Sequence, residues 1–388
     1  MDRKSLFLRQ PLAICFFIAL SMLGCVGASR PAVLKAGTQA SSHSAIANPM
    51  VSTTISPTLI KLPFTSHIIS LHRTRVQGPT VNGDTVIYLG REKPHLHSPS
   101  PNAIFSYDLK TDKDVLLTTS EYGENGVICC HVVSTHWLTW ITYSQPGNGT
   151  DWRVYVKNLR SGAETVLERA EDANRGGIWR GPFTAIWGDM FVWSSLKKTG
   201  AKNYHSTITL KQLTTGRQEV IAQADSPESV FGEVSLDGSH VVWSTTRVDG
   251  THSSADVMLY DMATCVTTQV THDGQSIEPQ VNGRYVAWRT GFGDVAPVIV
   301  QDLKANRRTA LGEQGGWLQL GDGLLIWHQW TNNSVALYDI IRYQVDSIVA
   351  KPTKYSNVVT IAGRTVVLVQ QPDDFVNGTG VIEIRSYP

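Results

Sequence analysis

The stretch VNGRYVAW, residues 281–288, has the pattern of a glycine turn that leads into a strand ending on tryptophan. The same outline returns at five other places along the chain: VNGDTVIY, IWGDMFVW, LDGSHVVW, LGDGLLIW and IAGRTVVL. Self-similarity of this kind is the mark of a repeat architecture, in which one structural unit is used several times.

A seventh unit has threonine in place of the turn glycine. The seven turn positions are Gly83, Thr135, Gly188, Gly238, Gly283, Asp322 and Gly363. The matching strand ends are Tyr88, Trp140, Trp193, Trp243, Trp288, Trp327 and Leu368. Successive turns are 39 to 53 residues apart, a period that is typical of stacked supersecondary units.

Each of the first six units also contains a strand, a polar turn and a second strand, as in YDLKTDKDVLLT from Tyr107 and YDMATCVTTQVT from Tyr260. β-Branched and aromatic residues alternate with polar ones in these segments, which favours strands over helices. With a short strand before each turn, every unit offers four antiparallel strands, A to D. The sequence therefore predicts an all-β fold, a β-propeller of four-stranded blades.

The repeated tryptophan fits this architecture, because a large flat side chain fills the wedge between neighbouring blades. The seventh unit ends after VIEIRSYP and lacks a D strand. The N-terminal segment PTLIKLPF, residues 57–64, is a spare strand that could complete it and remove two open sheet edges. We therefore predict seven blades closed by an N-terminal strand, with six or eight blades as the alternative.

The segments IEPQVNGRYVAW and VVWSTTRVDGTHSSADVMLYDMATCVTTQVT are similar to the repeats of the TolB family. The resemblance, to a TolB-like or WD-repeat-like β-propeller lipoprotein, covers residues 57–388 and concerns the repeat outline. Most units lack the Ser-Pro-Asp-Gly turn of that family, and Leu236-Asp237-Gly238 comes nearest. The resemblance implies an extracytoplasmic interaction module. It does not carry over the Tol partners, because no TolB-type N-terminal domain is present.

Residues 1–25 have the pattern of a signal peptide, with Arg3, Lys4 and Arg9 before an uncharged apolar run. The run ends on SMLGC, which resembles a bacterial lipoprotein box and predicts lipidation of Cys25. The expected location is the outer side of a bacterial membrane, held by a lipid anchor. The alternatives are secretion after cleavage near Ala28 and an uncleaved anchor.

Residues 26–56 are rich in Ser, Ala, Thr and Pro and are predicted to be a flexible tether to the propeller of residues 57–388. The net charge is +1 without long charged runs, so no nucleic-acid partner is expected. Cysteine spacing predicts no metal site, and no cofactor is expected. For the neighbours Cys129 and Cys130, two buried thiols in a strand are favoured over a strained vicinal disulfide.

The sequence contains no Gly-x-Ser-x-Gly elbow, no HExxH and no phosphate-binding glycine loop. Carboxylates contributed by different blades would leave no sequence motif, so a carbohydrate-active hydrolase or lyase stays open as the alternative function. The favoured function is a binding or scaffold module for an envelope protein, a peptide or a polysaccharide. An enzyme is not the leading interpretation.

Propeller sites usually lie on the face formed by the D–A and B–C connections. Four long loops belong to that face: GREKPHLHSPSPN, TSEYGENGVICC, RAEDANRGGIWRG and SSLKKTGAKNYHS. Long loops on a rigid scaffold often carry binding residues. The leading binding candidates are Trp179 and Arg180, followed by Tyr122, His95 and His97, with Trp317, His328 and Trp330 as a second cluster. The alternative is that Trp179 caps blade 3 and that the histidines are solvated.

Overall fold

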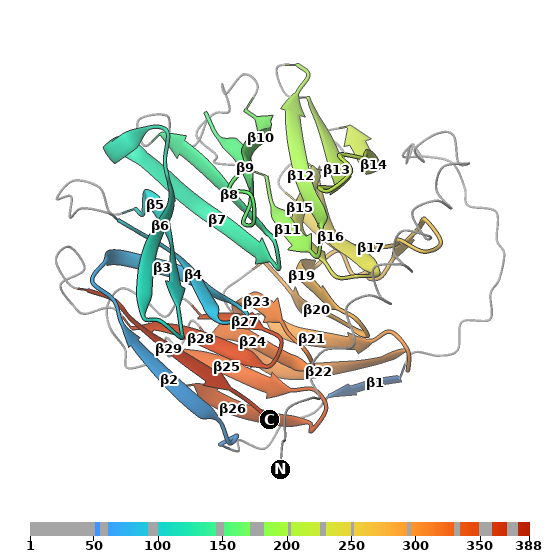
Figure 1. Cartoon of the computed structure of the whole chain (residues 1–388). Helices are drawn as coiled ribbons and strands as arrows, with labels where there is room; N and C mark the ends of the chain where they lie inside the picture. The colour runs from blue at the N-terminus through green and yellow to red at the C-terminus, as the bar shows by residue number, and fades with distance from the viewer. Residues whose placement is uncertain are drawn as a thin grey trace, which may run out of the picture.

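The computed structural model describes twelve segments of the chain. They are residues 51–54, 61–91, 100–144, 151–170, 182–200, 203–225, 230–249, 252–292, 296–329, 334–348, 359–370 and 379–388. These segments form seven sheets arranged as the blades of a β-propeller (Figure 1). The predicted fold, with seven blades of four antiparallel strands each, is confirmed.

The first three blades follow one another along the chain. Blade 1 contains β3 (Thr74–Asn82), β4 (Thr85–Arg91), β5 (Ala103–Asp108) and β6 (Lys113–Thr119). Blade 2 contains β7 (Gly126–Ser134), β8 (Trp137–Ser144), β9 (Arg153–Asn158) and β10 (Glu164–Arg169). Blade 3 contains β11 (Thr184–Trp187), β12 (Met190–Lys198), β13 (Tyr204–Gln212) and β14 (Gln218–Asp225).

The next three blades repeat the same order. Blade 4 contains β15 (Val230–Leu236), β16 (His240–Asp249), β17 (His252–Asp261) and β18 (Val266–Gln269). Blade 5 contains β19 (Ser276–Asn282), β20 (Tyr285–Thr290), β21 (Pro297–Asp302) and β22 (Arg307–Gln314). Blade 6 contains β23 (Gly316–Leu320), β24 (Leu324–Gln329), β25 (Ser334–Asp339) and β26 (Gln344–Ile348).

The seventh blade joins the two ends of the propeller. It contains β27 (Val359–Ala362), β28 (Thr365–Gln370) and β29 (Val381–Ser386), followed by the N-terminal strand β2 (Thr65–Ser70). β2 pairs antiparallel with β29, from Thr65 opposite Ser386 to Ser70 opposite Val381. Closure by an N-terminal strand is therefore confirmed, because β2 occupies the D position that the C-terminal unit lacks.

The position of the closing strand was predicted wrongly, since residues 57–64 were expected to form it. Residues 61–64 are outside any strand, and residues 57–60 lie outside the described part of the chain. Leu62 is nevertheless buried, and its backbone N–H donates a hydrogen bond to Asp346 Oδ2 over 3.0 Å. The apolar residues that suggested a strand thus pack beside blades 6 and 7 without pairing.

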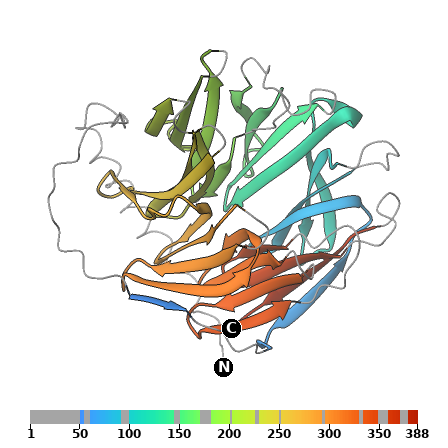
Figure 2. The same cartoon turned by 180° about the vertical axis from the view of Figure 1, so that it is seen from behind.

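Blade 5 has a fifth strand at its outer edge. β1 (Val51–Thr54) pairs in parallel with β22, from Val51 opposite Arg307 to Thr54 opposite Ala310. Figure 2 shows β1, in blue, along the outside of the orange strands of this blade. These four residues belong to the segment expected to be a tether, and they cover a D-strand edge that would otherwise be open.

The A strands form the innermost ring of the propeller. Each of them contacts the A strands of both neighbouring blades, including β27 with β3, so the ring is continuous (Figure 1). All seven repeat residues of strand B are buried, from Tyr88 to Leu368. They lie within strand B, which runs on by two to six residues beyond them, and not at its end as expected. Their predicted role in core packing is confirmed.

Candidate functional site

The D–A and B–C connections lie on one face of the propeller, because successive strands of a blade run in opposite directions. The four long loops indeed join β4 to β5, β6 to β7, β10 to β11 and β12 to β13. Of the predicted site residues, His95, His97, Trp179, Arg180 and Trp330, together with Cys25, lie outside the described residues. Tyr122, Trp317 and His328 are described.

A β-bulge recurs in the A strands at one position. In blades 1, 2, 5 and 6, two residues of strand A lie opposite the single repeat aromatic residue of strand B. The first residue of each bulge has a positive φ: Gly78 at 52°, Cys130 at 57°, Glu278 at 54° and Trp317 at 54°. The bulge of blade 4 is displaced by one residue and contains Gly232 and Glu233.

A left-handed conformation suits the glycine but costs the other three residues about 1–2 kcal/mol each. Bulges of this kind redirect a side chain and are frequent beside functional sites. Because the A strands form the inner ring, the bulges place Cys130, Glu278 and Trp317 at equivalent positions around the mouth of the propeller.

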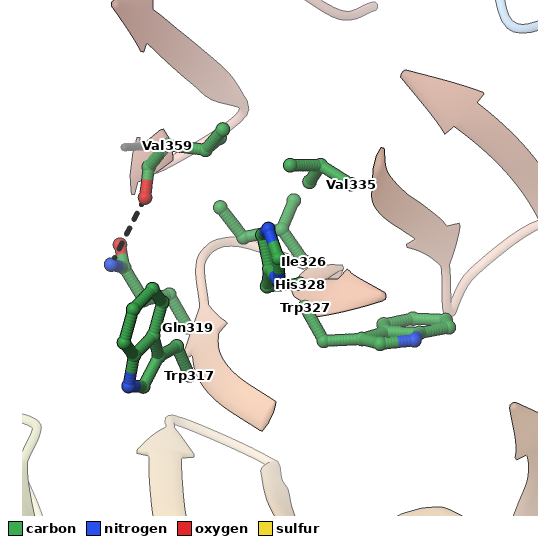
Figure 3. A pocket seen from close by; sticks show the side chains of 7 residues that line it. All are labelled: Trp317, Gln319, Ile326, Trp327, His328, Val335 and Val359. Atoms are coloured by element: carbon green, nitrogen blue, oxygen red, sulfur yellow. Dashed lines mark hydrogen bonds between the residues drawn. The ribbon is translucent and has the colours of Figure 1, made fainter. Parts of the chain in front are cut away.

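Within the described segments, Trp317 and Ile68 have the most exposed of the large apolar side chains, since 64% of the surface of each is accessible. Its ring lies 5.7 Å from that of His328, centroid to centroid, and the two planes are inclined by 50°. Both residues border a cavity of about 170 Å³. The cavity is lined by Trp317, Gln319, Ile326, Trp327, His328, Val335 and Val359, from blade 6 and the first strand of blade 7 (Figure 3).

Gln319 fixes one wall of this cavity. Its Nε2 donates a hydrogen bond to the carbonyl oxygen of Val359 over 3.2 Å, as Figure 3 shows, and its Oε1 accepts one from the N–H of Ile361 over 3.0 Å. The amide thereby joins the A strands of blades 6 and 7. Trp327 points away from Trp317 in this view, and its side chain belongs to the core between blades 5 and 6. The two hydrogen bonds of Gln319 therefore fix this wall of the cavity.

Glu278 holds the backbone of Trp317. Its Oε2 accepts a hydrogen bond from the Trp317 N–H over 2.7 Å, and its Oε1 lies 3.0 Å from Arg289 Nε. Burial raises the pKa of the Glu278 carboxyl, the charge of Glu233 adds to the increase, and Arg289 and the Trp317 N–H oppose it. Glu233, on β15, accepts a hydrogen bond from Ser244 Oγ over 2.7 Å. Two carboxylates from neighbouring A strands thus interact at the mouth.

Tyr122 lies apart from this cluster, at the junction of blades 1 and 2. It precedes a short 3₁₀ helix, Gly123–Asn125, and its hydroxyl donates a hydrogen bond to the carbonyl oxygen of Asp151 over 2.9 Å. The guanidinium of Arg153 lies 5.6 Å from the ring centroid. Burial, with the nearby Asp151, raises the pKa of Tyr122 to about 12. The residue joins two loops, and its binding role stays a prediction.

Sequence reasoning brought Trp317 and His328 together but missed Glu278, Glu233 and Gln319. Glu278 stands directly before Pro279 in the quoted stretch IEPQVNGRYVAW, but nothing in that pattern reveals a bulge. The expectation for the cysteine pair was also wrong in part, because Cys130 is exposed and Cys129 is only half-buried. The bulge explains this, since it moves Cys130 out of the regular alternation of the strand.

Within the described segments, no three His, Cys, Asp or Glu side chains gather closely enough to hold a metal ion. The same segments contain no helix with the length and apolar character needed to cross a membrane.

Comparison with known proteins supports the fold. No protein-family model matches the sequence, and no curated protein matches it. Among solved structures, an oligogalacturonate lyase in complex with manganese is similar at 11% identity and a TM-score of 0.52, covering 86% of this chain and 98% of the lyase. The β-propeller domain of the Trilobed protease from Pyrococcus furiosus, described as having an open velcro topology, is similar at 10% identity and a TM-score of 0.55. The match covers 81% of this chain and 95% of that domain.

TolB from Acinetobacter baumannii is also similar, at 12% identity and a TM-score of 0.42, with 79% of this chain and 78% of TolB covered. The likeness to the lyase and to the protease domain, both with TM-scores above 0.5, defines the class of protein as a β-propeller. The TolB-like repeat outline of the sequence agrees with the seven-bladed fold.

Proposed function

We propose that this chain is a binding module of the cell envelope, whose mouth on the D–A and B–C face receives an envelope protein, a peptide or a polysaccharide. A lipid on Cys25 would hold it on the outer side of a bacterial membrane. The observation that carries the binding proposal is the exposed indole of Trp317, fixed above a cavity beside His328.

Three features support Trp317 as the anchor of this site. Its side chain is exposed although a large indole usually gains free energy from burial. Its backbone keeps a left-handed conformation that costs free energy. The hydrogen bond from its N–H to Glu278 fixes that conformation before any ligand arrives. A preorganised aromatic anchor loses little conformational entropy on binding, and such residues dominate binding free energies.

The binding proposal can be tested with the full-length protein in detergent, screened against envelope polysaccharide fragments and peptides by tryptophan fluorescence and titration calorimetry. Trp317→Ala should weaken binding of any ligand found by at least about tenfold, since hot-spot aromatics contribute 2 kcal/mol or more. Ile341→Ala is the matched control, because Ile341 is 63% exposed but lies by the A–B turn of blade 6, on the opposite face. Equal affinity of the Trp317 variant and the control would contradict the proposal.

A second candidate function is a carbohydrate-active hydrolase or lyase, favoured by the interacting pair Glu233 and Glu278. Burial raises the pKa of the Glu278 carboxyl, and a carboxyl of this kind can act as a general acid beside a second carboxyl group. A fold of this kind occurs in an oligogalacturonate lyase. Release of oligosaccharides from polygalacturonate or other envelope glycans, lost in Glu278→Gln and Glu233→Gln but retained in Ile341→Ala, would favour the enzyme over the binding module.

The membrane part of the proposal depends on Cys25 and is tested separately. Cys25→Ala should release the protein from the membrane fraction into the soluble fraction, because acyl chains contribute about 0.8 kcal/mol per buried methylene. Unchanged membrane association of this variant would reject lipidation and favour an uncleaved anchor. Secretion of the unmodified protein by cells that carry the natural sequence would favour cleavage near Ala28.

A further inference from the structure

The bulge of β7 brings two adjacent cysteine side chains together. In a regular strand, successive side chains point to opposite faces of the sheet. Cys129 lies opposite Ile141 in regular pairing, whereas Cys130 is the first bulge residue and has a φ of 57°. The bulge cancels the alternation, and the two Sγ atoms lie 2.8 Å apart.

The two thiols differ in access. Cys130 is exposed at the mouth of the propeller, while Cys129 is half-buried among Val132, Tyr143 and their neighbours. The hydrogen bond with Cys130 and burial raise the pKa of the Cys129 thiol. Cys130 is therefore the thiol that a reagent meets first, and Cys129 is positioned behind it as a second thiol.

We propose that Cys129 and Cys130 are a redox modification site, which closes to a vicinal disulfide when a small-molecule disulfide enters the mouth of the propeller. This inference rests on the geometry of β7 alone and is independent of the function proposed for Trp317. The oxidant class is a low-molecular-weight disulfide such as oxidised glutathione.

The reaction proceeds by two thiol–disulfide exchanges. In the first, the Cys130 thiol loses its proton, its sulfur attacks one sulfur of the small disulfide, and one thiolate leaves and takes up a proton. In the second, Cys129 loses its proton and attacks Cys130 Sγ, which breaks the mixed disulfide and releases the second thiol. The small disulfide is reduced to two thiols, and the cysteine pair is oxidised with the loss of two hydrogen atoms.

The product should be easy to reduce again. Adjacent Cα atoms are about 3.8 Å apart across a trans peptide, which is shorter than the usual separation across a disulfide. Strained and exposed disulfides have higher reduction potentials than buried structural ones and are the labile class. The pair therefore suits reversible modification more than permanent crosslinking.

The test uses the full-length protein in detergent, treated with oxidised glutathione, blocked with a thiol reagent and digested with trypsin. The tryptic peptide of residues 114–153 contains Cys129 and Cys130 and no other cysteine, so Cys15, Cys25 and Cys265 do not interfere. The wild-type peptide should lose the mass of two hydrogen atoms without keeping glutathione, and dithiothreitol should reverse the change.

Two serine variants make the order of steps testable. Cys129→Ser should stop at a stable glutathione adduct on Cys130, because the second thiol is absent. Cys130→Ser should react at least about tenfold more slowly, since the remaining thiol is less accessible. A wild-type peptide that stays reduced, or that accumulates the glutathione adduct, would overturn the proposal. Circular dichroism and thermal melting of each variant establish that the fold is retained.

Discussion

The backbone N–H of Trp317 donates a hydrogen bond to Glu278 Oε2 over 2.7 Å, so the bulge of blade 6 is fixed by the bulge of blade 5. Glu278 in turn lies 3.0 Å from Arg289 Nε on the neighbouring B strand. The backbone conformation at Trp317 is thus set by a carboxylate that also belongs to a partly buried ion pair. A left-handed tryptophan persists only where its surroundings determine it.

Glu278→Ala should therefore loosen Trp317 and destabilise the propeller by about 1–3 kcal/mol, because it removes the acceptor of the Trp317 N–H bond and the carboxylate beside Arg289. Glu278→Gln keeps an oxygen for the N–H and should cost less. Hydrogen exchange of the Trp317 amide and denaturant unfolding measure the two effects. If the amide exchanges equally slowly in the alanine variant, Glu278 does not hold the bulge.

Replacing Trp317 or Trp327 by alanine should lower the stability of the fold by very different amounts, although both residues line the cavity. Trp327 is fully buried, so Trp327→Ala should cost about 3–5 kcal/mol of stability. Trp317→Ala should cost little, and Trp317→Gly should be more stable than Trp317→Ala by about 1 kcal/mol, because glycine accepts the φ of 54° without strain. Urea unfolding of the three variants measures this order. A glycine variant less stable than the alanine variant would contradict the strain at this position.

The architecture was readable from the sequence because it depends on a pattern that repeats. Tyr88, Trp140 and four later tryptophans occupy the same place in strand B, and Leu368 takes it in the seventh unit, so the pattern recurs in every blade. The end of the ring has no such repetition. Leu62 and Phe64 alternate with their neighbours as apolar residues of a strand do. The Leu62 N–H nevertheless donates to Asp346, and the pairing of β2 with β29 begins only at Thr65.

The closing strand offers a direct test of how the ring is held. Ile69 is buried beside Val367, Val369 and Ile382, whereas its neighbour Ile68 is 64% exposed. Ile69→Ala should cost about 2–4 kcal/mol, and Ile68→Ala should stay within about 0.5 kcal/mol of the wild type. Thermal and urea unfolding of the matched pair measure the difference. Equal losses in both variants would mean that β2 does not seal the seventh blade in solution.

The candidate site was readable only in part. Trp317 and His328 could be placed near each other because WHQW, residues 327–330, continues the repeat aromatic of blade 6. Glu278 and Cys130 could not be identified, since a bulge depends on how two strands pair and leaves no signature in either strand alone. Glu233 comes from a different blade, so its interaction with Glu278 depends on how blades 4 and 5 pack against each other.

His131, the second residue of the β7 bulge, should make stability depend on pH. Its ring packs against Gly78, where an added Cβ would lie 3.1 Å from His131 Cε1, and its Nε2 atom is buried. Burial lowers the pKa of His131 from 6.5 to about 4, while a hydrogen bond with the Ile87 backbone opposes the shift. Between these values the unfolded chain binds a proton that the folded protein does not. The neutral ring therefore stabilises the fold fully above pH 6.5, and this contribution is lost as the pH falls toward about 4.

Between pH 6.5 and pH 4 the free energy of unfolding should fall by about 3 kcal/mol, because a pKa difference of one unit corresponds to about 1.4 kcal/mol. His131→Gln cannot titrate, so its unfolding free energy should change less between pH 7 and pH 4 than that of the wild type, whatever its stability at pH 7. His272→Gln, at an exposed position, is the control and should keep the wild-type dependence. Urea unfolding across this pH range measures the slopes. A His131 variant with the wild-type slope would show that the ring is already hydrated or protonated in the folded protein.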